Sequence, residues 1–179
     1  MQEYIYCRSW AGAFKEARNP MNEEEAKKIH ETLYGISNQN VQGGFKEYTK
    51  RHRGGILQYT VLLGSLEKPT AFAQFVSNGI WVNFLDDKLR AYLEYSFNII
   101  GNNKLFLDKA VYREFDGDSD KVSKGTLYLF EEDGRLIIDR ETFLPEHLLE
   151  KATNTIDVSD NYEPFPVFGN FENILRQER

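Results

Sequence analysis

The stretch Leu89-Arg90-Ala91-Tyr92-Leu93-Glu94-Tyr95-Ser96-Phe97-Asn98-Ile99 decides the fold class of this chain. Apolar side chains occupy every second position, and the residues between them are mostly polar. Successive side chains of a β-strand point to opposite faces of a sheet. This period of two therefore predicts a long strand with one buried and one solvated face, central to one side of a sheet.

Similar apolar runs continue on both sides of this strand, from Gly55 to Phe143. They cover residues 56–63, 71–76, 80–85, 104–115, 128–132 and 135–138. Two pairs of runs are joined by Asn78-Gly79 and by Asp133-Gly134, dipeptides that favour the positive φ angles of a two-residue hairpin turn. The pattern predicts about six or seven consecutive antiparallel strands in a meander.

A helix over residues 22–34 is expected before the meander. Asn22 suits its N-cap, and Glu25 is placed to complete a capping box. Apolar side chains then recur at helical spacing, at Ala26, Ile29, Leu33 and Tyr34. Gly35 is predicted to end the helix.

Two further elements are expected near the C-terminus. Pro145 favours the first turn of a short helix over residues 145–153, with Leu148 and Leu149 as its apolar contact. Segment 162–171 is rich in aromatic residues and carries two prolines. Proline is excluded from interior strands, so this segment is predicted to be an ordered arm lying over the body of the protein.

These elements predict an α+β fold. It consists of a curved antiparallel meander of about six or seven strands, half-barrel or barrel-like, packed against the N-terminal helix. The chain has 179 residues, of which 41% are hydrophobic and 14% aromatic. That is sufficient for one core, and we expect a single domain over residues 1–179.

The sequence also indicates a compartment. Cys7 is the one cysteine, so neither an internal disulfide nor a cysteine-based zinc site is expected. The N-terminal residues lack a basic segment followed by an apolar run, and no stretch approaches the roughly 18 apolar residues that a membrane span needs. We therefore expect a cytoplasmic protein.

Charge is distributed unevenly along the chain. Residues 114–163 hold fourteen Asp or Glu and five Lys or Arg, whereas the whole chain has a net charge of -6. An acidic field attracts basic partners and repels nucleic acid and anionic membranes. We therefore expect a partner protein with a basic surface. In the alternative interpretation, the acidic residues lie in turns and at strand ends, where they only contact solvent.

Motifs for catalysis or cofactor binding are weak. His30, His52 and His147 show no metal-binding or catalytic spacing, and the glycine pairs lack a phosphate-loop pattern. Residues 116–120 begin like a calcium loop, but Lys121 and Leu127 replace the required glycine and glutamate. The basic cluster 50–53 has an RNA-binding character that does not suit a chain of pI about 5.2. We expect no enzyme activity, cofactor or metal.

A small acidic α+β domain rich in aromatic residues, with a helix before its meander and the tail segment 161–169, resembles the immunity proteins of bacterial toxin systems, particularly those of contact-dependent growth inhibition. The resemblance implies an inhibitor that binds a cognate toxin domain, often a nuclease, and blocks its active site or substrate surface. Acidic side chains then match the basic nuclease site, and aromatic anchors supply affinity. The candidate partner-binding residues are Asp116, Asp118, Asp120, Glu131, Glu132 and Asp133, with Tyr128 as an anchor if it lies on the outer face.

Two other functions stay open at this point. The first is a barrel-like module that binds a small apolar ligand on a concave face. The second is a hydrolase or isomerase whose polar groups converge only in the fold. An unfilled aromatic interior favours the first, and a deep cleft containing a histidine and a carboxylate favours the second. A filled core with an acidic, aromatic outer surface favours the inhibitor.

Overall fold

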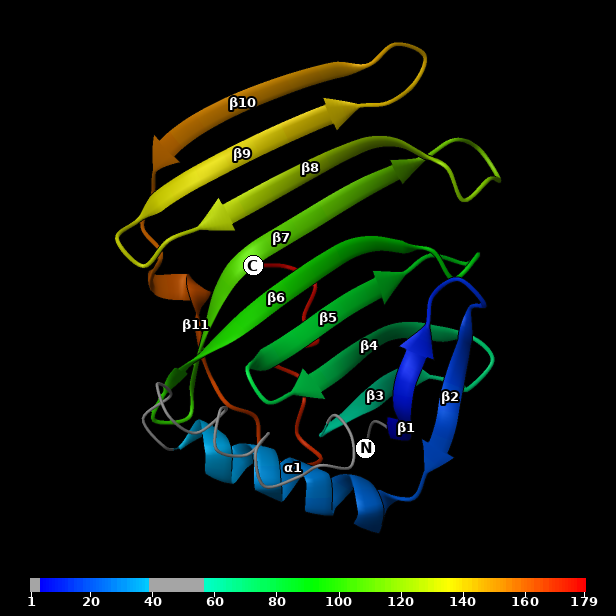
Figure 1. Ribbon diagram of the computed structural model, residues 1–179, viewed down its shortest axis with the longest axis vertical. Helices are drawn as coiled ribbons and strands as arrows, with labels where there is room; N and C mark the ends of the chain where they lie inside the picture. The colour runs from blue at the N-terminus through cyan, green and yellow to red at the C-terminus, as the bar shows by residue number, and fades with distance from the viewer. Residues whose placement is uncertain (1–3, 39–56) are drawn as a thin grey trace.

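The computed structural model describes residues 4–38 and 57–179 (Figure 1). Within these residues the chain forms one α-helix, eleven strands and a short 3-10 helix. In chain order the elements are β1 (Tyr4–Ala11), β2 (Glu16–Met21), α1 (Glu23–Ser37), β3 (Gln58–Gly64), β4 (Pro69–Val76), β5 (Gly79–Leu85), β6 (Ala91–Gly101), β7 (Lys104–Phe115), β8 (Val122–Phe130), β9 (Arg135–Thr142), β10 (Leu148–Thr155), η1 (Ser159–Asn161) and β11 (Tyr162–Pro164).

All described strands belong to one antiparallel sheet in the order β10-β9-β8-β7-β6-β5-β4-β3-β1-β2, with β11 paired to the start of β7. The predicted antiparallel meander and the α+β class are confirmed, and β6 lies between β5 and β7 as expected. The predicted count of strands was too small, because the β1–β2 hairpin, β10 and β11 were not anticipated. The sheet is open, since β2 and β10 form its two separate edges.

One face of the sheet, here called the back face, carries the main core. Helix α1 and the tail residues 165–175 pack on this face against alternate side chains of β1 and β3–β7. In β6 these are Leu93, Tyr95, Phe97 and Ile99, which confirms the period of two in the sequence. The opposite face, here called the front face, carries the intervening side chains, and a smaller cluster there packs the β1–β2 hairpin against Leu62, Phe72 and Leu85.

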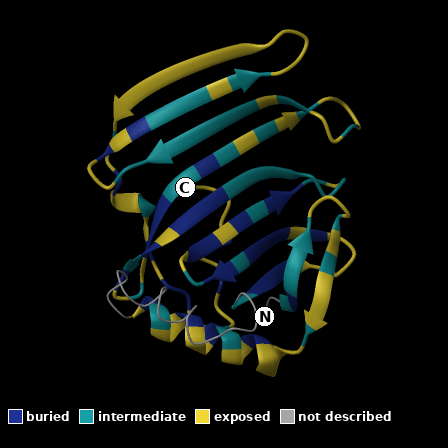
Figure 2. Ribbon diagram, in the orientation of Figure 1, coloured by how far each residue is buried: buried dark blue, intermediate teal, exposed yellow. Residues whose placement is uncertain are grey.

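Three strands extend beyond the part of the sheet that α1 and the tail cover. We call β8–β10, residues 122–155, the wing. Figure 2 shows buried residues concentrated in β3–β6, whereas every residue of β10 is exposed. In Figure 1 the wing lies at the end of the molecule far from α1.

The helix begins where the sequence predicts it. The Asn22 side chain accepts a hydrogen bond from the Glu25 backbone N–H at 2.8 Å. Gly35 does not end the helix, which continues to Ser37. The Ser37 carbonyl accepts the Asn103 N–H at 3.2 Å, so a contact with the β6–β7 turn holds the last helical residues. Within the described residues, no helix is long and apolar enough to cross a membrane.

The two predicted hairpins form, but their glycines act differently. Gly134 has φ of +88°, as the Asp133-Gly134 pattern predicts. Gly79 is the first residue of β5 and does not have a positive φ, so the expectation of positive angles there was wrong. A Cβ at Gly79 would overlap the Phe97 carbonyl oxygen, and glycine is therefore needed there for the close approach of β6.

The predicted helix over residues 145–153 is wrong. Leu148–Thr155 forms the edge strand β10, which pairs with β9 at eight consecutive positions. A strand exposed on both faces has no alternation of buried and exposed residues, so its sequence carries no period-two signal. The predicted aromatic arm is confirmed, since Phe165 and Phe171 are buried in the main core.

Candidate functional site

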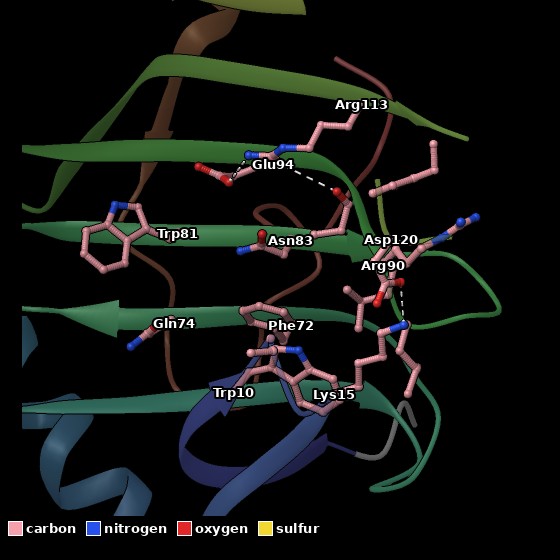
Figure 3. A pocket seen from close by; sticks show the side chains of 16 residues that line it. Trp10, Lys15, Phe72, Gln74, Trp81, Asn83, Arg90, Glu94, Arg113 and Asp120 are labelled. Carbon is pink, nitrogen blue, oxygen red and sulfur yellow. Dashed lines mark hydrogen bonds and ion pairs between the residues drawn. The ribbon is translucent and has the colours of Figure 1, made fainter. Parts of the chain in front are cut away.

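A cavity of about 500 Å³ opens on the front face, between the tip of the β1–β2 hairpin and the surface of β4–β7 (Figure 3). Both tryptophans of the chain, Trp10 and Trp81, line it together with Phe72. The rings of Trp10 and Phe72 lie 5.8 Å apart at 31° and belong to the small front cluster. Trp81 is 40% exposed, so part of its ring is available for contact.

Strand register brings polar side chains next to these rings. Gln74 lies opposite Trp81, and Phe72 lies opposite Asn83. Asn83 in turn lies opposite Glu94 of β6. Directly opposed residues of antiparallel strands project from the same face, and so amides and aromatic rings alternate across the cavity floor. This arrangement offers hydrogen-bond donors and acceptors beside apolar walls.

Glu94 is the centre of the ionic contacts on the cavity wall. Its carboxylate lies 3.2 Å from Lys109 Nζ and 3.1 Å from an Arg113 guanidinium nitrogen. Arg113 also donates to the Ala91 carbonyl at 3.4 Å. These contacts hold the Arg113 guanidinium at the border between the cavity and the wing.

Arg90 fixes the β7–β8 loop at the rim of the cavity. It donates to Asp86 at 2.7 Å and to the carbonyls of Gly117 and Ser119 at 2.9 and 2.7 Å. Its guanidinium lies 4.4 Å from the centre of the Phe115 ring. Burial acts to raise the pKa of Asp86, but hydrogen bonds from Arg90 and Lys88 outweigh it and lower that pKa. These contacts hold the β7–β8 loop in a fixed position at the rim of the cavity.

The acidic loop 116–120 is largely neutralised by lysines from the first half of the chain. Asp120 pairs with Lys15 at 2.7 Å, and Asp118 pairs with Lys88. The contact with Lys88 lowers the pKa of Asp118. Among the candidate charge residues, Asp120 alone lines the front cavity. The described residues contain no group of three or more His, Cys, Asp or Glu side chains that fits a metal ion.

The other candidate residues lie elsewhere. Glu131, Glu132 and Asp133 form the β8–β9 turn, at the end of β8 opposite to the 116–120 loop. Glu131 pairs with Arg135, and Glu132 accepts the Tyr162 hydroxyl at 3.2 Å. Tyr128 lies on the back face, where it packs against the main core. The structure thus places these candidates in two separate acidic turns and one partly buried position.

Of the residues that line the front cavity, Asp120 was predicted as a site residue, and the aromatic ones were missed. Their signal is an aromatic residue on the wet face of a strand: Trp81 alternates with the buried Ile80 and Val82. No period or motif links Trp81 to Trp10, because the two residues meet only through the sheet register and the fold of the β1–β2 hairpin.

The described histidines have other surroundings. His30 is buried, and its Nδ1 lies 2.6 Å from the Tyr59 hydroxyl. Burial among aromatic rings lowers the pKa of His30 to about 4. His147 is exposed and lies 2.7 Å from Glu141. Neither lines the front cavity, and the buried His30 borders a hollow of about 560 Å³ between α1 and the tail that Glu23 and Glu31 also line. His52, the basic cluster 50–53 and the two glycine pairs lie outside the described residues.

A second hollow, of about 370 Å³, lies on the front of the wing. Arg113 lines both cavities, so they adjoin at this side chain. The wing hollow includes the exposed apolar side chains of Phe143 and Leu149, and the charged residues Asp139, Glu141 and Lys151 also line it. Exposed apolar groups gathered in this way are typical of protein-binding surfaces.

The front surface combines aromatic walls, amides and fixed ion pairs, and this chemistry suits binding of a projecting segment or side chain. Among the described residues that line the front cavity there is no histidine, cysteine or serine. No protein-family model, curated protein or solved structure matches the chain. The interpretation of this surface therefore rests on its own geometry.

Proposed function

We propose that this protein binds and inhibits a partner protein, in the manner of an immunity protein that neutralises a bacterial toxin domain, and that the partner contacts the front face. The observation that carries the proposal is the placement of both tryptophans on an open cavity of the front face. Trp, Tyr and Arg are the residues that most often dominate binding energy at protein interfaces. Trp10, Trp81 and Arg113 belong to these residue types, and all three line the front cavity.

Neither core cluster includes Trp81 or Arg113, whereas Trp10 also packs in the small front cluster. Leu33 of α1 and Phe171 and Ile174 of the tail fill the back face and are fully buried. Trp81 contributes to neither core cluster. A large aromatic side chain that is partly exposed to solvent and lies outside the core contributes little to folding and can contact another molecule.

The remaining acidic charge supports a basic partner. Residues 155–162 lie against the β8–β9 turn, since the Ile156 N–H donates to the Gly134 carbonyl at 2.9 Å and the Tyr162 hydroxyl donates to Glu132. This end of the wing therefore gathers the acidic residues Glu131, Glu132, Asp133, Asp157 and Asp160. An acidic region on the surface of a protein accelerates encounter with a basic protein and opposes nucleic acid.

An apolar small ligand fits the front cavity less well. Lys15, Arg90, Glu94, Arg113 and Asp120 all line it. Burying an apolar molecule against these groups would remove water from charges without replacing its hydrogen bonds. A protein partner can supply the polar groups that such a wall requires.

The test is co-expression of the protein with the domain encoded by whatever reading frame lies immediately upstream of its gene, followed by titration of the purified pair. We expect protection of growth and a change in tryptophan fluorescence on binding, because both tryptophans line the cavity. Trp81→Ala should raise the Kd at least about tenfold. The matched control is Tyr112→Ala, since Tyr112 is 44% exposed but lies outside the front cavity.

Failure of the wild-type protein to protect cells or to bind that domain would reject the inhibitor. Equal affinities for wild-type protein and Trp81→Ala would reject the front cavity as the contact surface while leaving inhibition itself intact.

A further inference from the structure

The two edges of the sheet differ in their capacity to accept another strand. The β2 edge contains Pro20, and the preceding residue, Asn19, has φ of +51°. Proline and a break in the extended backbone both prevent strand addition. The β10 edge has neither feature, and β10 pairs with β9 over eight positions without a bulge. Every side chain of β10 is exposed.

The hydrogen bonds define which backbone groups of β10 point outward. The Ile156 N–H donates to Gly134 of the β8–β9 turn. Backbone groups alternate in direction along a strand, so the even-numbered residues of β10 face β9 and the odd-numbered residues face outward. The Thr155 N–H agrees, since it is bound at 2.8 Å by the Asn154 side chain. The N–H groups of Leu149, Lys151 and Thr153 therefore point away from the sheet.

We propose that β10 pairs with β10 of a second copy of this chain, antiparallel and around a two-fold axis at Ala152, so that two sheets become one. Outward-facing residues must bond to outward-facing residues, which restricts the alignment to every second register. In the register centred on Ala152, Lys151 lies opposite Thr153 of the second copy, and Glu150 lies opposite Asn154 of the second copy.

Charge selects this register over its neighbours. A shift of the centre by one residue toward the N-terminus places Lys151 opposite Lys151 of the second copy, and a further shift places Glu150 opposite Glu150 of the second copy. Like charges directly opposed across strands are destabilising. A shift in the other direction shortens the paired segment. The Ala152 register thus gives the longest overlap without opposed like charges.

The position of β10 leaves room for a second copy. The wing carries β10 to the end of the molecule far from α1 (Figure 1). The two-fold axis runs perpendicular to the sheet, so both front faces stay on the same side and both front cavities remain open. This inference is independent of the proposed function.

Light scattering during gel filtration, over a wide range of concentration, measures the mass directly. We expect twice the chain mass of 20.9 kDa. Thr153→Pro removes an outward N–H but no bond to β9, and it should give a folded monomer with an unchanged circular dichroism spectrum. Thr153→Val keeps the backbone donor and should remain dimeric. A wild-type monomer, or a Thr153→Pro dimer, overturns the proposal.

A cysteine substitution tests the register. Ala152 and its counterpart form a non-hydrogen-bonded pair, whose Cα atoms lie about 4.5 Å apart, within reach of a disulfide. Oxidised Ala152→Cys should cross-link to a covalent dimer, and Thr153→Cys, which faces Lys151 of the second copy, should not. Cys7 is buried and does not compete. Equal cross-linking of the two variants would reject the Ala152 register.

Discussion

Strands β3–β6 and the wing are made of the same antiparallel hairpins, yet they have different surroundings. Strands β3–β6 are covered on the back face by α1 and the tail, and their alternate side chains form the main core. No described element covers either face of most of the wing, and β10 is exposed along its whole length (Figure 2). The comparison indicates that β3–β6 determine stability, whereas most of the wing is exposed to solvent.

The largest effect is a loss of stability on truncating a core side chain, and the same truncation in the wing should cost much less. Phe97 of β6 is fully buried, and Phe97→Ala should lower the free energy of unfolding by about 3–5 kcal/mol, because it leaves a cavity in the core. Leu149 of the wing is 48% exposed, and Leu149→Ala should change that free energy by less than about 0.5 kcal/mol. Urea unfolding measures both. Comparable losses would contradict the division between β3–β6 and the wing.

The same division explains what the sequence predicts well. Strands β6 and β7 lie over the core, so one face is buried, and the alternation in residues 89–99 and the run 104–115 identify them. The wing edge lacks a buried face, and Leu148–Thr155 therefore resembles a helix as much as a strand. The β1–β2 hairpin is hidden for a related reason, since Pro20 and the positive φ of Asn19 interrupt β2.

The second effect is a pH dependence of stability that arises from His30, at the interface between α1 and the sheet. Burial lowers the pKa of His30 to about 4, whereas an unfolded chain has a value near 6.5. Between these values the unfolded chain binds a proton that the folded protein does not. The contribution of His30 to the free energy of unfolding should therefore be fully present above a pH of about 6.5. It should fall by roughly 3 kcal/mol as the pH drops to about 4.

Urea unfolding between these pH values, for wild-type protein and for His30→Gln, isolates this contribution. The variant lacks the titrating group, so the difference in stability between the two proteins should change with pH. Parallel curves would show that His30 titrates alike in the folded and unfolded chains.

The third effect is confined to the wing. Gly134 has φ of +88°, and a Cβ there would lie 2.7 Å from the Ile156 carbonyl oxygen. Gly134→Ala should cost about 1–2 kcal/mol and should speed amide hydrogen exchange in β8–β10 more than in β3–β6. Gly35→Ala is the contrasting variant, because Gly35 is an exposed helical residue with open space around it. That change should stabilise the protein by up to about 1 kcal/mol. Uniform acceleration of exchange in Gly134→Ala would argue against an independent wing.

The candidate site shows where charge counting along a sequence fails. Segment 114–163 is acidic, but the fold brings Lys15 and Lys88 from the first half of the chain to Asp120 and Asp118. Charged residues that are far apart in the sequence therefore form ion pairs in the folded protein. The acidic end at the β8–β9 turn is not neutralised to the same extent, and its residues Glu131, Glu132 and Asp133 were among the predicted candidates. The aromatic cavity was missed because its aromatic residues come from β1, β4, β5 and β7, which are far apart in the sequence.

The smallest effect concerns the contact that joins the β1–β2 hairpin to the loop leading into the wing. Lys15 and Asp120 are 30% and 66% exposed, so their ion pair is screened by water and contributes about 0.2–1 kcal/mol. A double-mutant cycle of Lys15→Ala and Asp120→Ala should give a coupling in this range, and the coupling should shrink as salt is added. The control is the exposed Glu24–Lys28 pair of α1, which has a similar length of 2.8 Å but lies within one helix. If opening of the wing separates Lys15 from Asp120, then Asp120→Ala should speed hydrogen exchange near the β7–β8 loop, and Glu24→Ala should not. Equal exchange in both variants would show that the hairpin and the wing are held together by the sheet alone.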